Sequence, residues 1–151
     1  MFVPSMKKLV GKRRGSAAIE FGLMIPLLLT ILMGVIEIGD AMYEAMQVYN
    51  SVEAGAVYAA KNGFDSAGIS AAVANATSTT GITATPAPAQ FCGCPSSAGV
   101  AQIACNSTCT GGIAPSQYVR ISAALNHQTI LPYPALSLPT TLTAQSIVRL
   151  N

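Results

Sequence analysis

The chain has 151 residues, of which 51% are hydrophobic and only 9% are charged. Soluble domains carry about 25% charged residues, so we predict that part of this chain lies in a membrane. The formal net charge is +2, but five of the eight basic residues precede Gly15, and the remainder holds three basic and six acidic residues. A nucleic-acid-binding domain needs a basic patch on its folded part, and this charge distribution excludes one.

Residues 1–15 are short and basic, and residues 21–36 (FGLMIPLLLTILMGVI) follow without a charge. A membrane-spanning helix needs about 20 mostly apolar residues. Residues 16–39 reach that length if Glu20 is tolerated, and we predict a single transmembrane segment there. Positive charge before the segment predicts a cytoplasmic N-terminus and a C-terminal domain outside the cytoplasm.

Three interpretations of this N-terminus compete. A secretory signal peptide needs small residues spaced A-x-A after the apolar run, and residues 37–46 (EIGDAMYEAM) offer none. The other two are an uncleaved anchor and an anchor that is cut on its cytoplasmic side. A carboxylate in lipid costs a few kcal/mol, so Glu20 either lies at headgroup level or serves recognition or assembly. A cut after Gly15 would give Ser16 a new α-amino group that can pair with Glu20 in the same or a neighbouring subunit.

Residues 12–39 (KRRGSAAIEFGLMIPLLLTILMGVIEIG) resemble the N-terminus of TadE-like proteins, the pseudopilins or minor pilins of the bacterial tight-adherence (Flp) pilus system. The resemblance rests on Arg13-Arg14-Gly15, the small residues 16–18, Glu20-Phe21, Pro26 and a Leu-rich run that closes at Glu37. It implies a processing site of Gly15, Ser16, Glu20 and Phe21, cut after Gly15 by a prepilin peptidase, with Glu20 as the assembly residue. It also implies a pilus-assembly subunit whose partners are the inner membrane, that peptidase and other pilin subunits.

We predict that the helix continues outside the membrane over residues 40–63, with Gly63 as its C-cap. Small side chains recur at three- and four-residue spacing along one face: Ala41, Ala45, Val48, Val52, Ala56 and Ala59. The acids Glu37, Asp40 and Glu44 are predicted to lie on a different face. The apolar face packs either on the protein's own globular part or on a neighbouring subunit, and the pattern leaves both open.

A second, short helix is predicted over residues 67–76, capped by Asp65 or Ser66. Residues 77–90 are rich in Thr, Ala and Pro, which predicts a loop with one short strand at 82–85.

Residues 117–125 and 141–150 alternate between apolar and polar side chains and are predicted strands, joined by a Pro-rich loop over 126–140. We therefore expect residues 64–151 to form a small α+β extracytoplasmic domain. The predicted fold class is α+β and pilin-like, with a long N-terminal helix, a small antiparallel sheet and a disulfide-clipped loop.

That loop, residues 90–112, holds the four cysteines Cys92, Cys94, Cys105 and Cys109. A Cys₄ zinc site usually has C-x₂₋₄-C spacing, whereas the first pair here is C-x-C. Outside the cytoplasm disulfides persist, so we predict two structural disulfides and no metal. A Cys92–Cys94 ring would be very small, which favours bonds between the two pairs, and the connectivity stays open.

Enzymatic chemistry is not predicted. His127 is the only histidine and lies in a predicted loop with no acid near it in sequence, so we expect a packed or solvated side chain. The globular part holds few titratable groups for acid–base catalysis, and no catalytic residue, cofactor or small-molecule substrate is predicted. The alternative function is an uncleaved, membrane-anchored envelope binding module whose disulfide-stabilised loop recognises a ligand.

Overall fold

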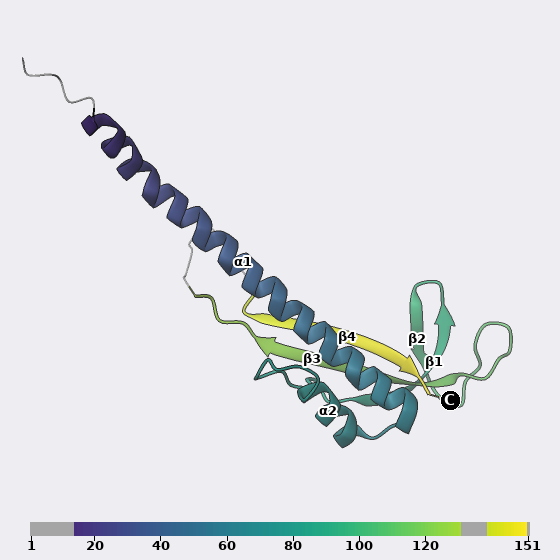
Figure 1. Cartoon of the computed structure of the whole chain (residues 1–151). Helices are drawn as coiled ribbons and strands as arrows, with labels where there is room; N and C mark the ends of the chain where they lie inside the picture. Colours follow the sequence, from purple (N-terminus) through teal and green to yellow (C-terminus); the bar gives the residue numbers. More distant parts are fainter. Residues whose placement is uncertain (1–13, 131–138, 151) are drawn as a thin grey trace, which may run out of the picture. The chain divides into compact units, whose positions relative to one another are not determined.

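The structure is a computed structural model that describes residues 14–130 and 139–150, with side chains from residue 18 onward. The chain divides into two compact units, Met1–Ile36 and Glu37–Asn151. The elements in chain order are α1 (Arg14–Asn62), α2 (Ser66–Ala74), β1 (Ala89–Ser96), β2 (Gly99–Ile103), β3 (Ser116–Asn126) and β4 (Thr141–Arg149) (Figure 1).

The described part of the first unit is the beginning of α1. Its large apolar side chains are exposed around the helix, from Ile19 at 68% to Ile36 at 46%. Pro26 lies inside the helix, and membrane helices tolerate an internal proline. A helix that is apolar on every side has no water-facing side, and by length and composition α1 can cross a membrane.

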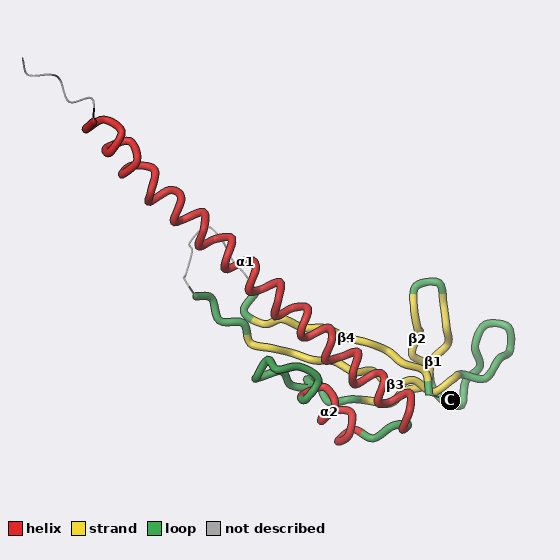
Figure 2. The backbone as a smooth tube through the Cα atoms, in the orientation of Figure 1, coloured by secondary structure: helices red, strands yellow, loops and turns green. Residues whose placement is uncertain are grey.

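The second unit is built on a four-stranded sheet in the order β2-β1-β3-β4, in which every neighbouring pair is antiparallel. Strand β1 pairs with β3 through its first half and with β2 through its second half. Strand β4 pairs with β3 along its whole length. Figure 2 shows β3 and β4 as long neighbouring strands and β1 and β2 as a hairpin. This arrangement confirms the predicted α+β fold class and the predicted strands at 117–125 and 141–150.

The second half of α1 packs within its own domain. The hydrophobic core joins Val48, Val52 and Ala59 of α1 to Ile69 and Val73 of α2 and to Val119, Ile121 and Ala123 of β3. Close approach is possible because Gly55 has no side chain. A Cβ atom at Gly55 would lie 2.7 Å from Cγ2 of Val73 and 3.1 Å from Cγ2 of Ile121. The alanine-rich face predicted from the sequence therefore serves intramolecular packing.

Both ends of the α1–α2 connection follow the predicted local chemistry. Gly63 has a φ of +79°, and its N–H donates to the carbonyl of Ala59 at 2.9 Å, which closes α1. Asp65 caps α2 by accepting from the N–H of Ala67 at 3.1 Å. Helix α2 ends at Ala74, slightly earlier than predicted.

The region predicted as a cysteine-rich loop contains more regular structure than the sequence indicated. Strands β1 and β2 form a hairpin over residues 89–103, and the loop is confined to the residues that follow it. The short strand expected at 82–85 is a single bridge between Thr83 and Ala124. Of the loop predicted over 126–140, residues 131–138 lie outside the described residues.

Candidate processing and assembly site

The predicted cut falls between Gly15 and Ser16, in the first turn of α1, which begins at Arg14. Residues 1–13 of the predicted leader lie outside the described residues. Ser16 and Glu20 are four positions apart on a helix, roughly 6 Å along its axis. Side chains at that spacing lie on the same side of the helix. An α-amino group created at Ser16 would therefore lie about one turn from the Glu20 carboxylate.

Glu20 and Phe21 both lie on the exposed surface of the first unit. Phe21 is 64% exposed, and the neighbouring Ile19 and Leu23 are 68% and 75% exposed. The Glu20 carboxylate thus lies within an otherwise apolar surface, where a charge is costly unless a cation accompanies it. The geometry suits recognition of a cationic group from the same helix or from a second one.

A second group of acidic residues lies at the start of the second unit. Glu37 is only 4% exposed, and its two carboxylate oxygens accept from the N–H of Ile130 at 2.9 and 3.1 Å. Glu37 and Glu44 are seven residues apart and share their side of the helix with Ala41 and Val48. The prediction that these acids lie on a different face from the apolar residues is therefore wrong for both.

His127, just beyond the end of β3, contacts the same face of α1. Its Nδ1 atom lies 2.7 Å from Oε2 of Glu44, and the two side chains are 0% and 22% exposed. The backbone N–H of His127 donates to the carbonyl of Thr140 at 3.0 Å. The sequence correctly predicted a packed histidine as one of two outcomes but missed its acidic partner. No local pattern signals that partner, because it lies 83 residues away.

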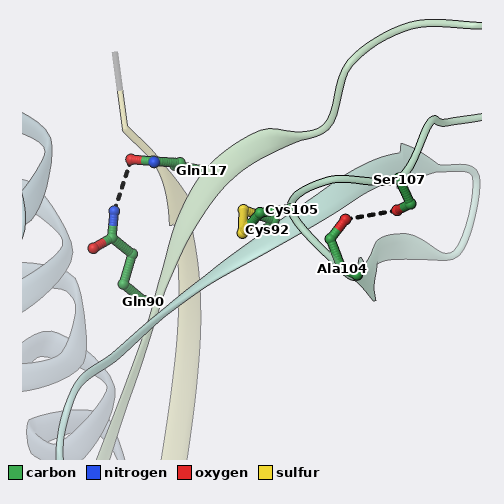
Figure 3. Close-up of a disulfide and its surroundings, with 6 residues drawn as sticks. All are labelled: Gln90, Cys92, Ala104, Cys105, Ser107 and Gln117. Carbon is green, nitrogen blue, oxygen red and sulfur yellow. Dashed lines mark hydrogen bonds between the residues drawn. A yellow bond between two sulfur atoms is a disulfide. The ribbon is translucent and has the colours of Figure 1, made fainter.

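The four cysteines form two disulfides, as predicted, and both join the first pair to the second. Cys92 bonds to Cys105 and Cys94 bonds to Cys109, with Cα–Cα distances of 5.1 and 5.6 Å. Cys92 and Cys94 are two residues apart on strand β1, and side chains at that spacing lie on the same face of a sheet. The C-x-C spacing is therefore the period of a strand and not that of a metal knuckle. Figure 3 shows the Cys92–Cys105 bond joining the hairpin to the following loop.

Gly93, between the two cysteines, is required by close packing. A Cβ atom there would lie 2.5 Å from Cγ1 of Val100 and 3.0 Å from the carbonyl oxygen of Ala101, both on β2. Gly93 and the adjacent Cys92 are the residues of β1 that pair with both β2 and β3. The strand can change partners at this point because no side chain separates it from β2.

Polar and aromatic contacts fasten the hairpin to β3. Nε2 of Gln90 donates to Oε1 of Gln117 at 2.7 Å (Figure 3). The rings of Phe91 and Tyr118 stack at 5.8 Å, and the guanidinium of Arg120 lies 4.8 Å from the centre of the Phe91 ring. These contacts hold the hairpin, which carries one end of both disulfides, against β3.

A surface pocket of about 250 Å³ lies beside the second disulfide. Its walls include Cys94, Cys109 and Ile113, and Arg149 of β4 contributes a positive charge. Apolar walls with one fixed charge are the usual make-up of a small binding pocket.

Residues 15–67 match the family model described as TadE-like protein. The match covers about a third of the chain, from the predicted cut through α1 to the start of α2. It confirms the resemblance that the sequence motif indicated. Comparison with curated proteins and with solved structures finds no match.

Proposed function

Because residues 15–67 are TadE-like, we propose that this chain is a structural subunit associated with a tight-adherence pilus machinery. In this proposal the chain is made as a precursor and cut between Gly15 and Ser16 by a prepilin peptidase. The mature N-terminus begins the apolar helix, and the domain from Glu37 onward lies outside the cytoplasm. The protein acts by assembly and catalyses no reaction.

The family match over α1 is the observation that carries this proposal. The exposed apolar surface of the first unit supports it, because such a surface suits either lipid or the apolar helices of other subunits. Two disulfides in the second unit support a location in an oxidising compartment. Both features agree with a single-pass protein of the inner membrane whose C-terminal domain is periplasmic.

Glu20 has a defined role in this proposal. Once the chain is cut, the α-amino group of Ser16 and the Glu20 carboxylate provide opposite charges about one helical turn apart. Pairing within one subunit would neutralise both charges in lipid. Pairing between subunits would add a directional contact to otherwise non-directional apolar packing, and so would set the axial position at which one subunit docks on another.

The alternative function is an uncleaved envelope binding module. The pocket beside the Cys94–Cys109 bond is the observation that favours it, because a disulfide-bonded loop with mostly apolar walls and the positive charge of Arg149 suits recognition of an anionic group. This alternative needs the same anchor and the same orientation, so the two proposals differ in the state of the N-terminus.

The deciding experiment is the intact mass and N-terminal sequence of the full-length protein, purified from its native membranes. A chain that begins at Ser16 supports the pilus-subunit proposal. A chain that still carries residues 1–15, from cells in which the prepilin peptidase is active on another substrate, overturns cleavage and leaves the binding module. A Gly15→Val variant is the matched control, because it should remain uncut without altering the apolar helix.

A further inference from the structure

We propose that Asp40, Glu44 and His127 form a binding site for a divalent transition-metal ion, with Zn²⁺ as the best-matched ion. One donor atom from each of the three residues lies within 4.8 Å of the other two. All three belong to the second unit. The proposal is independent of the pilus function, because it rests on the donor atoms alone.

The buried imidazole distinguishes this cluster from a group of surface acids. The His127 side chain is 0% exposed and points its Nδ1 atom at Glu44. Its Nε2 atom is buried and has no hydrogen-bond partner among the described residues. Because the two ring nitrogens point in different directions, Nδ1 is the atom that faces the carboxylates and would bind the ion in place of its contact with Glu44, while Nε2 stays on the far side of the ring from Glu44.

The charge of the cluster also favours a cation. Asp40 and Glu44 are one helical turn apart and bring two carboxylates to a single imidazole. In the described part of the chain, no lysine or arginine forms an ion pair with either carboxylate. A divalent cation would neutralise both carboxylates without requiring a basic side chain.

The donor types select the metal. An imidazole nitrogen with two carboxylate oxygens suits Zn²⁺, whereas Mg²⁺ and Ca²⁺ prefer oxygen donors only. Zinc sites with three protein ligands keep a fourth position for water, and both carboxylates are partly exposed, so solvent can reach that position. Tetrahedral zinc holds its donors about 3.3 Å apart. The 2.7 Å contact between His127 and Glu44 would therefore open slightly while the Asp40 carboxylate moves inward.

The neighbouring contact of Glu37 supports the site from outside it. By accepting from the N–H of Ile130, Glu37 holds the chain that follows His127 against α1. The histidine is thereby fixed on both sides, by the end of β3 before it and by Ile130 after it. An ion bound here would join α1 to the end of β3 directly after the predicted membrane segment.

The test uses the full-length chain in detergent, purified without a histidine tag and stripped of metal with a chelator. Titration with ZnCl₂ by calorimetry should give one ion per chain, and Co²⁺ should give the visible absorption of a tetrahedral site. All four cysteines are in disulfides and do not compete for the ion. Asp40→Asn should weaken zinc binding about 100-fold while leaving the His127–Glu44 pair, and therefore the fold, in place.

Glu53→Gln is the matched control, because Glu53 is an exposed acid on the same helix outside the cluster. It should bind zinc like the unmodified chain. The proposal is overturned if the unmodified chain binds no zinc, or if D40N and E53Q weaken binding equally. Binding of Ca²⁺ or Mg²⁺ as tightly as Zn²⁺ would also overturn it, because the imidazole would then not be a ligand.

Discussion

The Nδ1 atom of His127 lies 2.7 Å from Oε2 of Glu44, and this contact joins the end of β3 to the middle of α1 across 83 residues of sequence. The histidine is fully buried and the carboxylate is mostly buried. A polar pair in such a place stabilises the fold only while both partners are present, since either one alone would be buried without a partner.

We therefore expect His127→Ala to lower the free energy of unfolding by about 2–4 kcal/mol. Glu44→Gln should cost less, about 1 kcal/mol, because its amide oxygen can still accept from Nδ1–H. Thermal unfolding of the full chain in detergent, followed by near-ultraviolet circular dichroism of the tyrosines, measures both changes. A chelator in the buffer separates this effect from metal binding. Equal losses for the two variants would contradict the hydrogen-bond argument.

The contact between Glu37 and Ile130 predicts a protected amide on an exposed residue. Ile130 is 58% exposed, yet its N–H donates to both oxygens of a carboxylate that is 4% exposed. Amide hydrogen exchange at Ile130 should be slow in the unmodified chain and should accelerate at least tenfold in Glu37→Ala. Glu53→Ala, which removes an exposed acid from the same helix, should leave the exchange unchanged. Fast exchange in the unmodified chain would refute the contact.

The two disulfides should stabilise the second unit independently. Each closes a short stretch of chain, with sequence separations of 13 and 15 residues. Replacing either pair by serine should lower the free energy of unfolding by about 2–4 kcal/mol, mainly because the unfolded chain gains freedom.

The matched comparison is Cys92→Ser with Cys105→Ser against Cys94→Ser with Cys109→Ser, each measured by thermal unfolding under oxidising conditions. Peptide mapping without reductant should recover the Cys92–Cys105 and Cys94–Cys109 links in the unmodified chain. A Cys92–Cys109 link would contradict the connectivity.

The close contacts around Gly55 leave no room for a larger side chain at this position of α1. Alanine is the better helix former by about 1 kcal/mol, but its Cβ atom would press on Cγ2 of Val73. Overpacking a core costs about 1–3 kcal/mol, so after the gain in helix propensity Gly55→Ala should be net destabilising by up to about 2 kcal/mol.

Gly39→Ala is the control for this substitution, since a Cβ atom at Gly39 meets nothing within 4 Å. It should be neutral or stabilise the helix by up to about 1 kcal/mol. Thermal unfolding of both variants distinguishes the two glycines. If Gly55→Ala stabilised the chain as Gly39→Ala does, the close approach to Val73 would be wrong.

Local sequence chemistry predicted the parts of the fold that depend on neighbouring residues. Gly63 and Asp65 act as the predicted caps because capping involves groups only a few residues apart. The β1–β2 hairpin was missed because Gly93 and Pro95 obscure the alternation of the strand. The strand period was nevertheless present in the spacing of the cysteines.

The residues of the candidate sites also differ in whether the local sequence could reveal them. Glu20 could be singled out from sequence, because a charge in an apolar run is a local anomaly. The partners of Glu37 and Glu44 could not, since Ile130 and His127 reach α1 only after the sheet has formed. Periodicity assigned these acids to a different face of the helix from the apolar residues, whereas the fold buries Glu37 on the apolar side with a hydrogen-bonded partner.

If Glu20 acts in assembly by pairing with the α-amino group of Ser16, its substitution should impair assembly without preventing cleavage. Glu20→Gln removes the charge but keeps the size and the exposed position of the side chain. The bond after Gly15 is unchanged, so N-terminal sequencing should still find chains that begin at Ser16. The α-amino group would lose its anionic partner, and co-purification with the other pilus subunits from native membranes should fall at least tenfold, since one charged contact in lipid contributes a few kcal/mol.

Glu53→Gln, with the same change of charge outside the membrane segment, should assemble normally. If Glu20→Gln assembled as well as Glu53→Gln, pairing with the α-amine would not be what docks the subunit. If Glu20→Gln remained uncut, the residue would act in recognition by the peptidase instead.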